Sequence, residues 1–110
     1  MSLIVQKYGG TSVADLERIR NVAQRVAKTF DQGHDVVVIL SAMAGVTDNL
    51  IGMARQVDQR PDKRELDVLL ATGEQTTAAL LAMTLQAMRY RAQSLLGHQA
   101  EVITDCDFGN

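Results

Sequence analysis

Residues 3–12 read LIVQKYGGTS. An apolar run leads directly into a lysine, two adjacent glycines and two hydroxyl side chains, and a helix-like pattern follows. Glycine accepts positive φ and lets a ligand approach the backbone, while a lysine and the unpaired N–H groups of a helix N-terminus attract anions. The stretch is therefore a candidate phosphate-binding turn, and the same residues also fit a plain tight turn between a strand and a helix.

The residues on either side of this turn predict a strand and then an amphipathic helix. Residues 3–7 are typical of a short buried strand. Behind the turn, apolar side chains recur at the three- and four-residue spacing of one helical face. They are Leu16, Ile19, Val22, Ala23, Val26 and Phe30. Ser12 followed by Asp15 resembles a capping box at the start of this helix, and Gly33 is its expected C-cap.

Residues 36–40 (VVVIL) predict a second strand, because a continuous β-branched and aliphatic run suits a strand covered on both faces. Small residues follow at 41–45, and Thr47 or Asp48 is the expected N-cap of a helix through residues 50–57. A right-handed βαβ crossover brings the turns after the two strands to the same carboxyl edge of the sheet. Ligands bind at that edge in α/β proteins, so both turns are candidate binding loops.

The second half of the chain predicts helices followed by two weaker strands. Pro61 suits the first turn of a helix, and the helical pattern after it is interrupted at residues 72–74 (TGE), where we expect a break or bend. The piece at residues 75–90 is apolar on more than one face, so we expect it to pack centrally or against another subunit. Residues 93–96 and 101–104 are the strand candidates.

Composition and charge exclude several classes of function. With 110 residues, 46% of them hydrophobic and 4% aromatic, the chain can form one domain with an aliphatic core. A net charge of −2, with Lys and Arg scattered along the chain, argues against nucleic acid as a partner. The chain opens without a leader pattern, and no apolar stretch approaches the ~20 residues of a membrane span, so we expect a cytoplasmic protein without a membrane partner.

Cysteine and histidine usage argues against a disulfide and against a metal site. Cys106 is the one cysteine, and His34 and His98 are too far apart in sequence for zinc-ligand spacing. Asp105 and Asp107 form a D-x-D pair, which is more often a solvated loop than a metal site. We therefore expect no metal held by the protein itself.

Three separated motifs, in this order, resemble the amino-terminal part of the aspartate kinases of the amino acid kinase superfamily. They are residues 5–15 (VQKYGGTSVAD), 40–48 (LSAMAGVTD) and 71–74 (ATGE). The resemblance covers residues 1–110 and implies an α/β, three-layer sandwich with helices on both faces of a mainly parallel sheet. The family's chain would continue for several hundred residues, so we expect a shortened amino-terminal lobe without the ACT regulatory domains.

The resemblance implies transfer of the γ-phosphoryl group of ATP to the side-chain carboxylate of L-aspartate, in lysine, threonine and methionine biosynthesis. Mg²⁺ would be bound mainly through the ATP. Lys7 is assigned to the ATP phosphates and to the stabilisation of charge on the transferring group. The same phosphates would contact Gly9, Gly10, Thr11 and Ser12. The acceptor pocket would contain Ser41, Thr47 and Glu74, with Glu74 on the α-amino group of aspartate.

Each assignment has a structural alternative. On spacing alone, Lys7 and the glycines support anion binding and nothing more specific. Ser41 can simply end a strand, and Thr47 can cap a helix. Glu74 lies in an otherwise apolar helical region, where its charge must be exposed, paired or used. It can instead cap a helix or pair with a helix dipole.

Three classes of function stay open. We favour an aspartate kinase that forms a homo-oligomer, and we expect this chain alone to be inactive because it holds part of the site. The second class is another kinase of the superfamily, acting on glutamate, acetylglutamate, carbamate or a nucleotide, against which the words KYGGTS and TGE argue. The third is a non-catalytic domain that folds, self-associates and at best binds phosphate.

Overall fold

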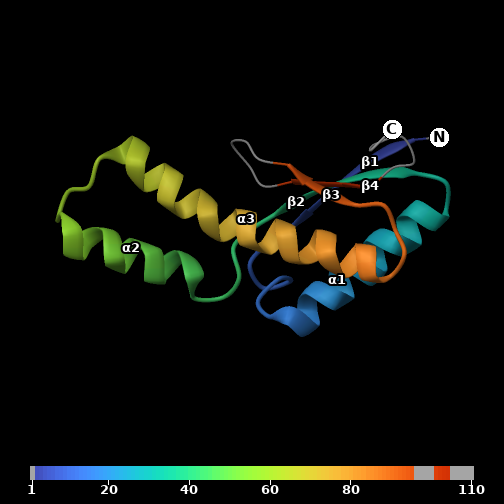
Figure 1. Cartoon of the computed structure of the whole chain (residues 1–110), viewed down its shortest axis with the longest axis horizontal. Helices are drawn as coiled ribbons and strands as arrows, with labels where there is room; N and C mark the ends of the chain where they lie inside the picture. The colour runs from blue at the N-terminus through green and yellow to red at the C-terminus, as the bar shows by residue number, and fades with distance from the viewer. Residues whose placement is uncertain (1, 96–100, 105–110) are drawn as a thin grey trace.

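The computed structural model describes residues 2–95 and 101–104, and shows a four-stranded sheet with three helices (Figure 1). The elements are β1 (Leu3–Tyr8), α1 (Leu16–Asp31), β2 (Asp35–Leu40), α2 (Val46–Val57), α3 (Lys63–Ala87), β3 (Gln93–Leu95) and β4 (Glu101–Thr104). All four predicted strands are present. The sequence hypotheses about His98, Asp105, Cys106 and Asp107 fall outside the described residues.

The sheet has the order β1-β2-β4-β3. β1 and β2 pair in parallel, with Leu3 opposite Asp35 and Tyr8 opposite Leu40, which confirms the predicted βαβ unit. β4 pairs antiparallel with both β2 and β3. Within the described sheet the parallel pairing is therefore confined to the βαβ unit, because β3 and β4 follow each other closely along the chain and pair as a hairpin.

Both helices that pack on the sheet lie on the same face of it (Figure 1). The core between them is aliphatic, and its fully buried members include Ile19 and Val26 of α1, Val36 and Val38 of β2, and Leu81 and Leu85 of α3. The prediction that β1 is a buried strand is wrong for this chain. Leu3 and Val5 are 64% and 59% exposed, because no described element covers the opposite face of the sheet.

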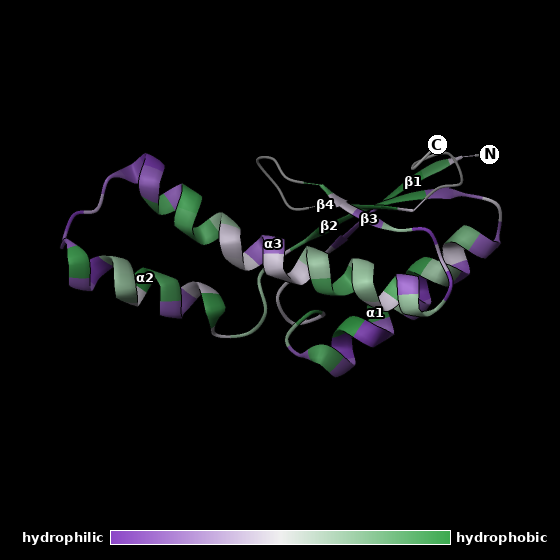
Figure 2. Ribbon diagram, viewed as in Figure 1, coloured by the Kyte–Doolittle hydropathy of each residue, from purple (hydrophilic) through white to green (hydrophobic). Residues whose placement is uncertain are grey.

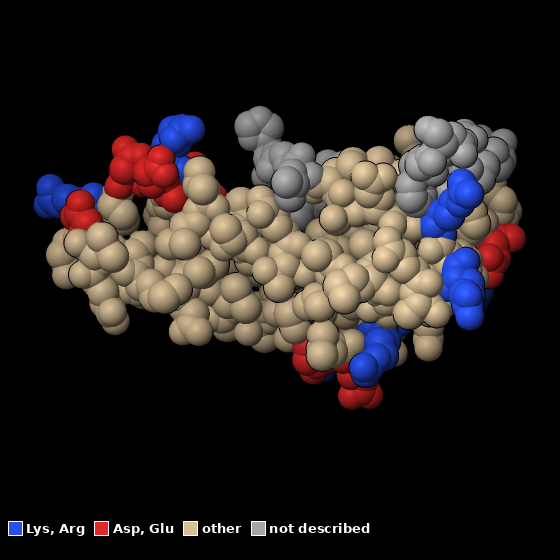
Figure 3. All heavy atoms as spheres, in the orientation of Figure 1, with Lys and Arg blue, Asp and Glu red and all other residues tan. Residues whose placement is uncertain are grey.

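α2 and the first half of α3 form a helical arm that extends away from the sheet (Figure 1). Apolar residues run along both helices of the arm, as Figure 2 shows, and Met53, Val57 and Val68 are more than half exposed. α3 continues without interruption from Lys63 to Ala87, so the predicted break at residues 72–74 is wrong. In the view of Figure 3 the charged side chains of the arm gather at its outer end, so most of its visible surface is uncharged and the described chain does not cover it.

α3 is long and apolar enough to cross a membrane by length and composition, contrary to the expectation that no stretch approaches such a span. Its second half, however, packs into the core of this chain. Thr77, Ala78, Leu81 and Leu85 are all buried there. Contacts with the sheet and with α1 therefore account for the apolar character of the second half of α3.

The starts of the three helices differ from the predicted caps. Asp15 caps α1, with its Oδ1 accepting a hydrogen bond from the backbone N–H of Arg18 at 2.9 Å, so Ser12 forms no capping box. α2 begins at Val46 behind Gly45, whose φ is 78°, and this N-cap has no side-chain hydrogen bond. α3 is capped by Asp62, so Pro61 precedes the helix instead of lying in its first turn.

Candidate functional site

The turn after β1 offers a cation and free backbone donors at one place. Lys7 is exposed near the end of the strand. The turn is closed by hydrogen bonds from Ser12 N to the Gly9 oxygen (3.1 Å) and from Val13 N to the Gly10 oxygen (3.3 Å). The N–H groups of Gly10 and Thr11 have no acceptor within the described chain. Such donors beside a lysine suit an anion.

The backbone conformation of this turn does not require glycine at position 9 or 10. Among the described residues, Gly33 and Gly45 are the glycines with positive φ, so the expected positive φ at Gly9 or Gly10 is wrong. A Cβ at Gly9 would meet no atom within 4 Å, and one at Gly10 would lie 3.7 Å from the Ala42 oxygen. The fold therefore leaves open space over Gly9, which a ligand can fill, while Gly10 lies at ordinary contact distance from the backbone of Ala42.

The turn after β2 is hydrogen-bonded to the first turn. The N–H of Ser41 donates to the Tyr8 oxygen, and the N–H of Ala44 donates to the Ala14 oxygen, each at 3.2 Å. Ser41 is half-buried at the end of β2. The two turns thus lie at the same carboxyl edge of the parallel strands, as the βαβ prediction requires.

α3 reaches this edge at Gly73, which packs against the start of the second turn. A Cβ at Gly73 would lie 2.9 Å from Cγ1 of Val46 and 3.1 Å from Cβ of Ala42. Ala42 therefore lies between the first turn, through Gly10, and α3. The glycine allows the helix to approach this closely, which places the adjacent Glu74 at the same edge.

The structural alternatives for Glu74 and Thr47 do not hold. Glu74 is half-buried in the middle of α3, far from its N-cap at Asp62, so it neither caps a helix nor meets the positive end of a dipole. Its carboxylate has no hydrogen bond or ion pair among the described residues. Thr47 is exposed inside the first turn of α2, behind the N-cap Gly45. Both side chains are left free for a ligand.

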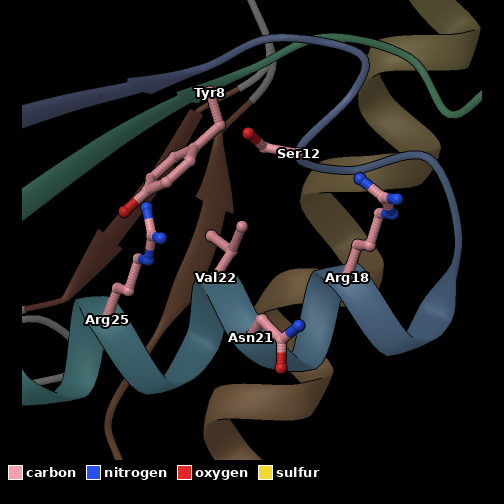
Figure 4. A pocket seen from close by; sticks show the side chains of 6 residues that line it. All are labelled: Tyr8, Ser12, Arg18, Asn21, Val22 and Arg25. Atoms are coloured by element: carbon pink, nitrogen blue, oxygen red, sulfur yellow. The ribbon is translucent and has the colours of Figure 1, made fainter.

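The structure also contains a polar cavity of about 160 Å³ between β1 and α1 (Figure 4). It is lined by Tyr8, Ser12, Arg18, Asn21, Val22 and Arg25. Of these residues, the sequence predicted only Ser12 as part of a site. Arg18 and Arg25 were missed because arginines on the polar face of an amphipathic helix are usually solvent-exposed charges. The sequence signal that could have grouped them is the spacing of positions 18, 21 and 25, which are three and four residues apart and therefore share one face of the helix.

Comparison with known proteins agrees with the fold and the motifs. Residues 2–107 match the model of the amino acid kinase family. An aspartate kinase from Synechocystis superimposes with a TM-score of 0.83 at 50% identity, over 86% of this chain and 16% of that one. Aspartokinase III of E. coli, solved with aspartate and ADP, superimposes with a TM-score of 0.69 at 21% identity, over 83% of this chain and 30% of that one, and shows the fold alone. The chain belongs to the amino acid kinase family.

The curated relatives that this chain matches include several aspartokinases. The aspartokinases of Geobacillus stearothermophilus and Mycobacterium tuberculosis are 52% and 53% identical over 110 residues, which is 100% of this chain. The chain spans 27% and 26% of these two proteins, and the match lies in their amino-terminal part. The resemblance to aspartate kinases that the three motifs predict is confirmed.

Proposed function

We propose that this chain forms the phosphate-binding and acceptor-binding edge of an aspartate kinase, which transfers the γ-phosphoryl group of MgATP to the side-chain carboxylate of L-aspartate. The names of the relatives that are more than 50% identical to this chain support this activity. The observation that carries the proposal is the turn at Gly9 and Gly10, where the N–H groups of Gly10 and Thr11 have no acceptor in the described chain and the space over Gly9 is open.

The donor half of the site acts by position and charge. Lys7, Gly9, Gly10, Thr11 and Ser12 would hold the phosphates. Backbone amides and a lysine stabilise the negative charge of the transferring group without any covalent step. Mg²⁺, carried by the ATP, neutralises further phosphate charge. The acyl phosphate product would enter lysine, threonine and methionine synthesis.

The acceptor half would use Ser41, Thr47 and Glu74. Glu74 is a half-buried carboxylate without a partner in the described chain, so the ammonium group of an amino acid would supply the missing positive charge. The hydroxyl groups of Ser41 and Thr47 can donate to a carboxylate of the acceptor. Donor and acceptor would meet at the edge where Ala42 joins the turns and α3.

The test is a chimera in which this chain replaces the matching segment of the Geobacillus stearothermophilus aspartokinase. We expect aspartate-dependent ADP release, and at least a tenfold loss of kcat/KM in the Lys7→Ala chimera. Lys28→Ala, an exposed lysine in the last turn of α1, is the matched control and should leave kcat/KM unchanged. Equal turnover with and without Lys7 would remove this residue from the site.

The same chimera separates the rival activities. If glutamate, acetylglutamate or carbamate is phosphorylated in preference to aspartate, the acceptor assignment is wrong and the chain belongs to another branch of the family. The non-catalytic alternative rests on the exposed apolar arm and sheet face. A folded chimera without any kinase activity, together with self-association of the chain in sedimentation measurements, would favour that alternative.

A further inference from the structure

The cavity between β1 and α1 is lined by two arginines and by no acid (Figure 4). Arg18 and Arg25 flank it from two turns of the same helix. The neighbouring acids in the sequence, Asp15 and Glu17, line an adjoining cavity that shares Arg18 and Asn21 with this one, and Asp15 already caps α1. The cavity therefore holds two positive charges without a neutralising side chain in its wall.

Both arginines have donors to spare. Arg18 uses Nη1 to bind the Thr11 oxygen at 3.0 Å, which fixes its guanidinium beside the turn and leaves its other N–H groups unused. A guanidinium carries five N–H donors in a rigid plane. The Arg25 side chain forms no hydrogen bond or ion pair within the described chain. Two guanidinium groups, of which Arg18 is held by a hydrogen bond, thus line one small space.

Tyr8 forms the wall of the cavity beside Arg25. Its hydroxyl group donates to Oε1 of Gln6 at 3.0 Å, so it is a fixed neighbour and not a free donor. Figure 4 shows the Arg25 guanidinium next to this hydroxyl and the Ser12 hydroxyl pointing toward the space between them. Burial raises the pKa of Tyr8 against the opposing charge of Arg25, so the phenol stays neutral and adds no negative charge.

We propose that this cavity is a second anion site, which binds a phosphate group through Arg18, Arg25 and Ser12, with the Asn21 amide at its mouth. Two guanidinium groups and the Ser12 hydroxyl surround this space from different sides, which suits the tetrahedral oxygens of a phosphate, and the guanidinium fork matches phosphate geometry. The cavity size fits one such group. The ligand is either free phosphate or the phosphate end of a small phosphomonoester.

This site is separate from the phosphate-binding turn around Lys7. Successive residues of a strand point to opposite faces of the sheet. Tyr8 packs on the helix-bearing face, whereas Lys7 lies on the open face with Leu3 and Val5. Ser12 is the one residue that both sites share. Binding in the cavity therefore does not depend on the Lys7 side chain.

The experiment is a titration of the 110-residue chain with inorganic phosphate, followed by calorimetry and by the side-chain N–H resonances of its arginines. We expect saturable binding, with shifts of the Arg18 and Arg25 resonances. Arg25→Gln should weaken binding at least tenfold. Arg20→Gln, on the exposed side of the same helix, is the matched control and should change it less than twofold. Lys7→Ala should retain the binding.

Further titrations show whether the bound group is free phosphate or a phosphomonoester, and they include the results that would contradict the proposal. Glycerol phosphate binding as tightly as inorganic phosphate assigns the site to a phosphomonoester, and much weaker binding assigns it to the free ion. Tighter binding of acetate, equal weakening by Arg20→Gln, or a lack of arginine shifts would overturn the proposal. Loss of binding in Lys7→Ala but not in Arg25→Gln would also overturn it, while leaving the kinase proposal intact.

Discussion

A methyl group on Gly73 of α3 would lie 2.9 Å from Cγ1 of Val46 at the start of α2. This is closer than Cβ atoms pack in proteins, so the two helices can meet here because position 73 has no side chain. The contact joins the arm to the carboxyl edge of the sheet. It also brings α3, at the residue before Glu74, against Ala42 in the turn after β2.

Gly73→Ala should destabilise the chain, although alanine is the better helix former. The helical preference of alanine contributes about 1 kcal/mol, whereas overpacking costs about 1–3 kcal/mol. Val46 is β-branched and cannot turn away easily, and the Ala42 Cβ at 3.1 Å is attached to the backbone. We expect a net loss of about 1 kcal/mol in urea unfolding.

Gly52→Ala in the middle of α2 is the control for this prediction, since a Cβ there meets nothing within 4 Å. It should stabilise the chain by about 0.5–1 kcal/mol. The cost of Gly73→Ala should shrink in a Val46→Ala background, because the nearest overlapping atom is gone. A stabilising effect of Gly73→Ala equal to that of Gly52→Ala would contradict the close contact.

Gly10→Ala should separate ligand binding from stability. The Gly10 backbone does not have positive φ, and a methyl group there meets the Ala42 oxygen at an ordinary 3.7 Å. We therefore expect unchanged or slightly higher stability in urea unfolding. The methyl group would occupy the space over the turn, so the chimera should bind MgATP at least tenfold more weakly. A large loss of stability instead would mean that the glycine serves the fold.

Glu74→Gln in the chimera should raise the KM for aspartate more than tenfold and leave the KM for ATP within a factor of two. A hydrogen bond to a charged group contributes about 1.5–3 kcal/mol, which corresponds to at least a tenfold change. Asp67→Asn, an exposed acid on the same helix, is the control. Unchanged aspartate kinetics in Glu74→Gln would exclude this carboxylate from the acceptor pocket.

The pKa of Tyr8 should lie above 10 and rise further in Arg25→Gln, because burial raises it and the Arg25 charge lowers it. The chain has two tyrosines, so a titration of phenolate absorbance in a Tyr90→Phe background reports Tyr8 alone. An unfolded tyrosine loses its proton first, near pH 10, so this group's contribution to stability falls as the pH rises above that value. An unchanged Tyr8 pKa in Arg25→Gln would place the guanidinium away from the phenol.

The sequence alone determined the elements whose signals are local. The run at residues 36–40 and the apolar spacing of α1 predicted β2 and the helix before it, and the two strands with one helix between them predicted the parallel pair. The order Lys7, Gly9 and Gly10 predicted a turn at the carboxyl edge. The strands and the helix depend on the spacing of apolar side chains, which residues close together in the sequence determine. The parallel pair depends on the right-handed crossover of a βαβ unit.

Tertiary structure decided the features that depend on distant contacts. α3 continues through Gly73, which packs against Val46 and Ala42. α2 starts at Val46 behind its N-cap Gly45, before the predicted caps Thr47 and Asp48. The joint placement of Ser12, Arg18 and Arg25 around one cavity arises because the turn folds back over α1. The helix propensity of a single glycine or threonine does not predict these helix boundaries or this cavity, because packing between segments far apart along the chain supplies the deciding free energy.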